Sequence, residues 1–222
     1  EDVNISTAED PVEINLPGIN QVQVDERTGM TFPKALKAFL RQDPDIILVG
    51  EIRDLETASI AVKAAQTGHM VMSTLHTNDC PQTLTRLQDM GIPPFAVATT
   101  INLITAQRLA RRLQPDLRVP VDMPADAMLS EGFTMEDVER TQRLYGPGTS
   151  ADCPSGYKGR VGIYQVMPIS DAIKRLIMEG ANAVQIADQS AAEGIWDIRK
   201  AGLQKALRGM TSLAEINRVT VE

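Results

Sequence analysis

Three short apolar segments, each followed by charged or polar side chains, constrain the fold of this sequence most. The middle one, Ile46–Val49, is continuously apolar, which is typical of a strand buried in a parallel sheet. It is followed at once by Gly50 and Glu51. The other two segments share this design, and the polar residues after them are Glu9 and Asp10 in one case and His76, Asn78 and Asp79 in the other.

Two helical patterns separate these segments. Residues 54–68 are rich in alanine and end at Gly68, a residue suited to a left-handed helix cap. Residues 31–42 carry one apolar stripe, at Phe32, Ala35, Leu36, Phe39 and Leu40. Alternating strands and helices predict an α/β fold with a parallel sheet flanked by helices and right-handed crossovers. Ligands of such sheets bind beyond the carboxyl ends of the strands, so we expect the three polar groups to converge there.

The segments around this pattern complete an expected α/β core over residues 1–113. Residues 20–30 alternate and then turn at Thr28 and Gly29, which predicts a small hairpin arm. Residues 81–91 and 93–113 predict two more helices, the second ending in a basic run near its negative dipole end.

The rest of the chain predicts two smaller parts. Residues 114–168 lack a strong period and predict an irregular insert. It would hold one helix, started by a capping box at Thr134–Asp137, and a short strand or hairpin. Residues 169–222 predict a small, mostly helical C-terminal subdomain, with helix N-caps at Ser170, Asn182 and Ser212.

Composition narrows the function classes. The 222 residues carry 22 basic and 29 acidic side chains, a net charge of -7, which does not support a broad surface for nucleic acid or anionic lipid. No apolar stretch approaches the roughly 20 residues that span a bilayer, and no signal-peptide pattern is present. The two cysteines, Cys80 and Cys153, are far apart. A reducing cytoplasm is the simplest compartment for such a sequence.

Glu51 carries the clearest chemical signal. Burying each residue of Ile46–Val49 contributes about 1.5–3 kcal/mol, whereas an unpaired carboxylate buried with them costs several kcal/mol. Glu51 is therefore expected where solvent, a cation or a hydrogen-bond donor reaches it. An apolar strand followed by an acidic residue is how nucleotide hydrolases hold Mg²⁺ or polarise a water. The plainer alternative is a buried strand that ends in glutamate because a loop begins.

The neighbouring polar groups favour a phosphate and metal site. Glu9, Asp10 and Glu51 would bring three carboxylates to one sheet edge, where they repel one another unless a divalent cation or a basic group intervenes. Mg²⁺ is the expected cation, held directly or through water. His76 could donate to a terminal phosphate, or make an ordinary structural hydrogen bond. His69 is more typical of a structural residue, since it follows the expected helix end.

Zinc is not expected from the ligand spacing. A closed zinc site needs four ligands, and neither His69 nor His76 is near a pair of cysteines.

These residues also carry a family resemblance. LRQDPDIILVGEIRD, at residues 40–54, resembles the signature of the type II/type IV secretion ATPases. STAEDPVE and TGHMVMSTLHTND resemble the acidic and histidine boxes of that family. INLPGINQVQV, PQTLTRLQDMGIPPF, AQRLARRL and GYKGRVGIYQVMPIS are most similar to the motors that extend type IV pili, with type II secretion motors next.

The resemblance implies a hexameric RecA-like P-loop ATPase on the cytoplasmic side of a bacterial inner membrane. ATP hydrolysis would drive pilin polymerisation through an integral-membrane platform protein. Glu51 takes the catalytic Walker B position of the family, and Glu9 and Asp10 match its acidic box near the metal. His76 matches the histidine near the terminal phosphate, and His69 is the other histidine of that box.

Two departures from the family pattern stand out. No Gly-x-x-x-x-Gly-Lys-Ser/Thr phosphate loop occurs, and the family places that loop before the acidic box. Since a strand-like segment begins directly after Glu1, we expect the chain to be the C-terminal part of a longer protein and to be inactive alone. Secondly, many relatives carry two cysteine pairs, and here Gln114 and Leu117 stand at the first pair while only Cys153 remains near the second. Zinc is therefore not expected.

The expected function is thus ATP hydrolysis for pilus assembly. A type II secretion motor is the alternative within the family. A non-catalytic assembly module, in which the helical tail holds a partner and the acidic cluster is vestigial, is the rival from another class. The acidic balance argues against a nucleic-acid translocase.

Overall fold

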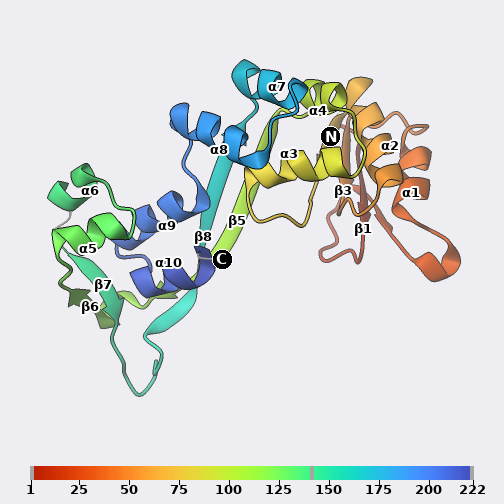
Figure 1. Ribbon diagram of the computed structural model, residues 1–222. Coiled ribbons are helices and arrows are strands. Elements are labelled where there is room, and N and C mark those ends of the chain that lie inside the picture. Colours follow the sequence, from red (N-terminus) through yellow and green to blue (C-terminus); the bar gives the residue numbers. More distant parts are fainter. Residues whose placement is uncertain (1–2, 141–142, 221–222) are drawn as a thin grey trace. The chain divides into compact units, whose positions relative to one another are not determined.

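The computed structural model describes residues 3–140 and 143–220, which form two compact units (Figure 1). Unit one contains the residues up to Asn102 together with Pro168–Ala187. Unit two contains Leu103–Met167 and the residues from Asp188 onward. Within the described ranges, no helix has both the length and the apolar character that a bilayer crossing requires.

The centre of unit one is a four-stranded parallel sheet in the order β2-β1-β3-β4. The central strands β1 (Ile5–Glu9) and β3 (Ile46–Val49) lie between β2 (Asn20–Gln23) and β4 (Met70–Ser73). The three strands expected from the apolar segments are therefore present and parallel. Their carboxyl ends lie at one edge of the sheet.

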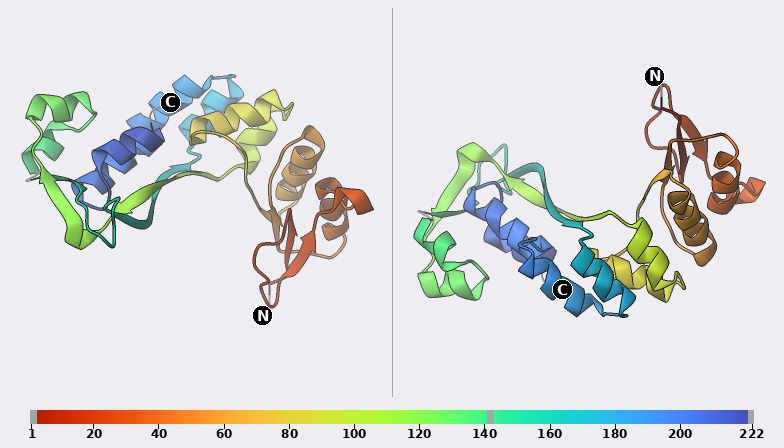
Figure 2. Two further views of the ribbon diagram at one scale, coloured as in Figure 1. Left: turned by 90° about the horizontal axis from the view of Figure 1, so that it is seen from below. Right: turned by 90° about the horizontal axis from the view of Figure 1, so that it is seen from above.

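Two helices pack on this sheet, and their ends follow the sequence signals. Helix α1 (Phe32–Phe39) and helix α2 (Leu55–Gln66) lie side by side (Figure 2). Asp54 caps α2 by accepting from the backbone N–H of Thr57 at 2.8 Å, and Gly68 follows the helix with a φ of 104°. Positive φ costs glycine little, so Gly68 stops the helix as predicted.

Burial along β3 alternates, although its continuous apolar run is typical of a strand covered by helices on both faces. Ile47 and Val49 are fully buried, whereas Ile46 and Leu48 are half-buried and Met70 and Met72 on β4 are exposed. Among the described residues, one face of the sheet is thus much better covered than the other.

The expected hairpin arm is only partly correct. Asn20–Gln23 is β2, which pairs parallel with β1 rather than folding back as one arm of a hairpin. The turn at Thr28–Gly29 is present, as the short 3-10 helix η1 (Glu26–Thr28) closed by a bridge between Asp25 and Met30.

The helix predicted over residues 93–113 is wrong in its second half. Helix α4 (Pro94–Thr100) ends early, and Leu103–Leu113 is the strand β5, which pairs with β8 (Tyr157–Pro168) (Figure 1). Leucine, alanine and arginine favour helices, but burying Ile104, Ala110 and Leu113 in unit two overrides that weak preference. Helices α3 (Cys80–Asp89) and α7 (Asp171–Met178) belong to unit one with α4.

The insert is more regular than predicted. It contains the short 3-10 helix η2 (Pro115–Leu117) and an antiparallel pair, β6 (Arg118–Val121) with β7 (Leu144–Pro147). It also holds two helices, α5 (Ala125–Ser130) and α6 (Met135–Arg140), where one was expected. The capping box that begins α6 is confirmed: the backbone N–H of Asp137 donates to Thr134 Oγ1 at 3.1 Å, and that of Thr134 donates to Asp137 Oδ2 at 3.0 Å.

The helices of the C-terminal part begin at the predicted caps. Ser170, Asn182 and Ser212 each accept from the backbone N–H three residues ahead, at the starts of α7, α8 (Ala183–Ala192) and α10 (Leu213–Thr220). Helices α9 (Ile198–Leu207) and α10 pack on β5 around the core of unit two. That core includes Phe133, Ile163, Leu203 and Ile216.

Candidate active site at the carboxyl edge of the sheet

Glu51 lies directly beyond the end of β3, in backbone held from both sides. Gly50 N–H donates to Ala8 O on β1 at 2.8 Å. On the other side, Thr74 Oγ1 donates to Gly50 O at 2.7 Å and Ile52 N–H donates to Thr74 O at 3.0 Å. A Cβ at Gly50 would approach Ala8 O to 3.1 Å, so glycine permits this close approach of β3 to β1.

Both carboxylate oxygens of Glu51 are engaged. Arg53 Nη2 lies 2.5 Å from Glu51 Oε1, and His76 Nε2 lies 3.1 Å from Oε2. The hydrogen bond from Arg53, followed by that from His76, holds the pKa of Glu51 below its usual range against the opposing effect of burial. The side chain of Glu51 is 12% exposed, whereas those of Arg53 and His76 are 61% and 86% exposed. Glu51 is thus an ionised carboxylate that solvent-exposed groups hold in place.

Glu9 is fixed in a different way, through one oxygen only. Thr7 Oγ1 donates to Glu9 Oε1 at 2.5 Å, and Gln21 Nε2 donates to the same oxygen at 3.0 Å. These two bonds, Thr7 first, hold the pKa of Glu9 below its ordinary value. Within the described chain no donor reaches Glu9 Oε2, so this oxygen remains available to a ligand.

The positive charge of Arg53 partly offsets the negative charges of the carboxylates at this edge. The pKa of Arg53 is raised by its hydrogen bond to Glu51 and further by the negative charges of Asp10 and Glu26. Asp10 itself is exposed. No three His, Cys, Asp or Glu side chains converge in the described ranges, so Glu9, Asp10 and Glu51 share an edge without forming one cluster. Sequence reasoning did not assign this role to Arg53, although an arginine two residues after Glu51 was the available signal.

The two histidines lie at opposite ends of β4. His76 follows the strand, and its Nε2 lies 3.1 Å from Glu51 Oε2. His69 precedes the strand, and its Nδ1 lies 3.0 Å from Ala64 O and 3.1 Å from Thr67 Oγ1 at the end of α2. The structure therefore does not bring His69 to the edge that holds Glu51.

A polar cavity of about 300 Å³ opens beside His76. Its other walls come from the segment after β4 and from one face of α3. They are Thr77, Asn78, Gln82, Thr85, Arg86 and Asp89. Hydroxyl, amide and guanidinium groups predominate, which suits an anionic ligand beside His76.

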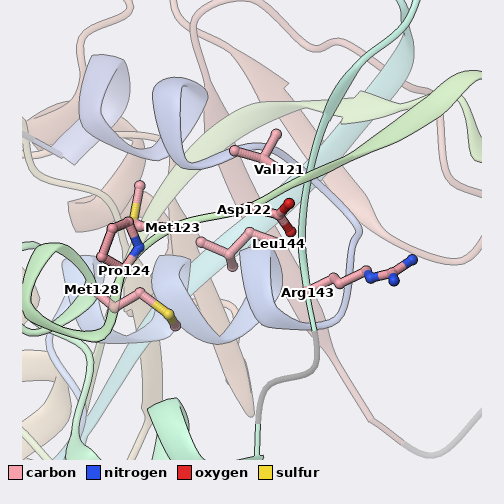
Figure 3. Close-up of a pocket in the computed structure, with 7 residues that line it drawn as sticks. All are labelled: Val121, Asp122, Met123, Pro124, Met128, Arg143 and Leu144. Atoms are coloured by element: carbon pink, nitrogen blue, oxygen red, sulfur yellow. The ribbon is translucent and has the colours of Figure 1, made fainter.

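Unit two holds a second, larger cavity of about 400 Å³ (Figure 3). Asp122 and Arg143 supply its charged groups. Its remaining wall is apolar, formed by Val121, Met123, Pro124, Met128 and Leu144. None of the predicted site residues lines it, so it is separate from the strand-end site.

Sequence reasoning missed one ionic cluster, also in unit two. Glu215, with a side chain only 1% exposed, accepts from Arg111 Nη2 at 2.8 Å and from Arg218 Nη2 at 2.5 Å. The backbone N–H of Arg111 donates to it as well, at 2.9 Å. Burial raises the pKa of Glu215, but the bonds from Arg218 and Arg111 outweigh it and lower the pKa to about 2. A glutamate three residues before an arginine on an amphipathic helix gave no signal of burial.

The structure aligns over 100% of the chain, and 54% of the other chain, with the pilus retraction motor PilT bound to ADP, at 26% identity and a TM-score of 0.72. The Legionella pneumophila ATPase DotB shares the fold, at 20% identity and a TM-score of 0.67 over 98% of the chain and 51% of that chain. The fold is thus the RecA-like fold of these ATPases, as predicted.

The chain belongs to the family described as "Type II/IV secretion system protein", whose model matches residues 1–218. It is 60% identical to the type IV pilus assembly ATPase PilB of Pseudomonas aeruginosa, over 99% of the chain and 38% of that protein. It is 43% identical to type II secretion system protein E of Aeromonas hydrophila, over 100% of the chain and 44% of that protein. The chain therefore spans about two fifths of the length of these relatives, and the predicted family is confirmed.

Proposed function

We propose that this chain is the hydrolysis and coupling part of an ATPase that drives type IV pilus assembly. The observation that carries the proposal is Glu51, delivered by a central parallel strand and held between Arg53 and His76, in a chain 60% identical to a pilus assembly ATPase. Identity to the type II secretion relative is lower, at 43%, which favours pilus assembly over secretion.

In this proposal Glu51 polarises the attacking water from the Walker B position, and its lowered pKa keeps it ionised for that task. His76 contacts the terminal phosphate and links it to Glu51. The departing phosphate has polar groups beside it in the cavity next to His76. Phosphoryl transfer depends on such positioning and charge stabilisation more than on covalent chemistry by the protein.

The carboxylates suit Mg²⁺, which would neutralise phosphate charge when bound. Mg²⁺ prefers hard oxygen ligands, keeps several waters and often takes only one or two carboxylates besides substrate phosphates. Glu9, Asp10 and Glu51 share one edge of the sheet without forming a complete set of metal ligands, which is consistent with that type of Mg²⁺ coordination. We propose that they hold the ion directly or through water.

The intact protein is proposed to act as a hexamer in the bacterial cytoplasm, at the inner membrane, on an integral-membrane platform protein. The side chains of Arg53 and His76 are 61% and 86% exposed, so the site is open to a neighbouring subunit. Zinc and nucleic acid have no part in the proposal.

The decisive test is Glu51→Gln in the intact protein. We expect ATP turnover to fall at least about a hundredfold while nucleotide binding stays within about threefold, because the charge is needed in the transition state rather than for binding. Glu179→Gln, an exposed substitution after α7, is the matched control and should turn over normally. Near-normal turnover in Glu51→Gln would remove the assigned role.

Two further outcomes separate the rivals. The 222-residue chain contains no Gly-x-x-x-x-Gly-Lys-Ser/Thr, so we expect no ATPase activity from it alone. An intact protein without Glu51-dependent turnover that still binds its partners would instead support the assembly module. Complementation of a pilus-assembly defect, compared with a secretion defect, decides between the two motors.

A further inference from the structure

The side chain of Gln21 on β2 makes three hydrogen bonds, one of them to Glu9. It stands opposite Thr7 in the register of β2 with β1, so both side chains lie on the same face of the sheet as Glu9. Its Nε2 donates to Glu9 Oε1 at 3.0 Å and to Ile14 O at 3.0 Å. Its Oε1 accepts from the backbone N–H of Leu16 at 2.7 Å.

This network fixes the orientation of the Gln21 amide. The backbone N–H of Leu16 can only donate, so the amide oxygen must face it and the NH₂ group must face Glu9. Thr7 and Gln21 then occupy the same oxygen of Glu9, Oε1. The carboxylate cannot rotate without breaking both bonds, and its other oxygen is the one left for a ligand.

We propose that Gln21 is a positioning residue of the ATPase site, which orients Glu9 so that Oε2 faces the Mg²⁺–nucleotide complex. This inference rests on the proposed function. Groups that orient a metal-binding carboxylate contribute substantially to affinity and rate, because they remove rotational freedom before the ligand arrives. Gln21 acts through Glu9 and needs no contact with the nucleotide.

The same side chain ties an exposed apolar loop to the carboxylate. Residues 10–19 connect β1 to β2, and within this loop Ile14 is 69% exposed and Leu16 is 48% exposed. Gln21 holds both residues by their backbone while also holding Glu9. A displacement of the loop therefore changes the hydrogen bond that orients Glu9.

The test uses Gln21→Met in the intact protein, since methionine has a similar length and no hydrogen-bonding amide. We expect kcat to fall about tenfold and the Mg²⁺ concentration for half-maximal binding of a fluorescent ATP analogue to rise about tenfold, as for other groups that support metal ligands. Gln21→Glu is the second variant: it keeps an acceptor for Leu16 but loses the donor to Glu9, and should lose at least as much activity.

Asn20→Ala is the matched control. Asn20 is the neighbouring residue on β2 and makes one comparable side-chain bond, to Asn4 Oδ1 at 3.0 Å. Its kcat and Mg²⁺ requirement should stay within about twofold of the parent, and its stability loss should be smaller than that of Gln21→Met, since it removes one bond rather than three. A merely structural role for Gln21 would make both variants equal in kcat and Mg²⁺ requirement, and that result overturns the inference.

The outcome is distinguishable from failure of the proposed function. If the parent protein shows Glu51-dependent turnover and Gln21→Met and Gln21→Glu both behave like Asn20→Ala, only the positioning role is lost. If Glu51→Gln has no effect, the proposed function fails with it.

Discussion

Two carboxylates in this protein are each bound by two basic side chains, but they differ in burial and in their backbone contacts. Glu51 in unit one is bound by Arg53 and His76, which come from exposed segments after two strands. Glu215 in unit two is bound by Arg111 and Arg218, and in addition by the backbone N–H of Arg111. Glu215 is 1% exposed, against 12% for Glu51.

This difference in burial means that the Glu51 carboxylate can exchange its partners for a ligand, whereas the Glu215 carboxylate cannot. Both side chains that bond the Glu51 carboxylate are solvent-exposed, so in the proposed function a nucleotide or metal could replace one without unfolding the strand. Glu215 lies in the first turn of α10, where its backbone N–H donates to the Ser212 cap, and its side chain joins α10 to β5. We therefore expect changes at Glu215 to alter stability first and changes at Glu51 to alter chemistry first.

The largest stability effect is predicted for Glu215→Ala. Removing one partner of a buried ionic cluster typically costs about 3–5 kcal/mol, and here it also leaves the backbone N–H of Arg111 unpaired. Trp196, the single tryptophan, lies in unit two and reports its unfolding in urea by fluorescence. Glu139→Ala on the exposed face of α6 is the control and should stay within about 0.5 kcal/mol. Equal effects of the two variants would contradict the comparison.

Lowering the pH should remove most of the stability that the Glu215 carboxylate contributes. The pKa of Glu215 is lowered to about 2 from an ordinary 4.5, so the stabilisation is complete above about pH 4.5 and is lost as the pH falls towards 2. A depression of that size corresponds to about 3 kcal/mol in all. Urea midpoints of the parent should therefore fall more steeply between pH 5 and 3 than those of Glu215→Gln. Parallel curves for the two proteins would show that Glu215 does not titrate as stated.

Unit one was largely predictable because its signals are local. The apolar segment Ile46–Val49, the cap at Asp54 and the glycine at position 68 each act within a few residues, and parallel pairing then brings Glu9, Glu51 and His76 to one edge. What escaped prediction there was the partner of each carboxylate. Whether Arg53 pairs with Glu51 or with the next residue depends on side-chain geometry that no spacing encodes.

Unit two was poorly predictable because its structure depends on distant pairing. Leu103–Leu113 has the composition of a helix and becomes a strand only because β8, more than forty residues later, pairs with it. Glu215 finds Arg111 across about a hundred residues, in a contact that helix periodicity cannot foresee. The helix caps at Ser170, Asn182 and Ser212 were correct since capping is local.

A smaller stability effect is predicted for Arg53→Gln. Arg53 is 61% exposed and its ion pair with Glu51 is accessible to solvent, so its loss should cost less than about 1 kcal/mol. Loss of its hydrogen bond should also let the pKa of Glu51 rise towards the ordinary value. Urea unfolding of unit one, followed by circular dichroism, measures the first effect. A cost as large as that of Glu215→Ala would mean that the Glu51 cluster is part of the structural core.

The smallest stability effect should come from His76→Asn, which tests the comparison most sharply. The His76 side chain is 86% exposed and, among the described residues, makes one hydrogen bond, of 3.1 Å to Glu51, so the unfolding free energy should change by less than about 0.5 kcal/mol. Turnover of the intact protein should nevertheless fall at least about tenfold, because in the proposed function His76 links Glu51 to the phosphate. His69→Asn provides the contrast, since its ring nitrogen contacts the end of α2 and its removal should cost about 1 kcal/mol. If His76→Asn were instead the more destabilising of the two without loss of turnover, the exposed histidine would be a structural group and Glu51 would resemble Glu215.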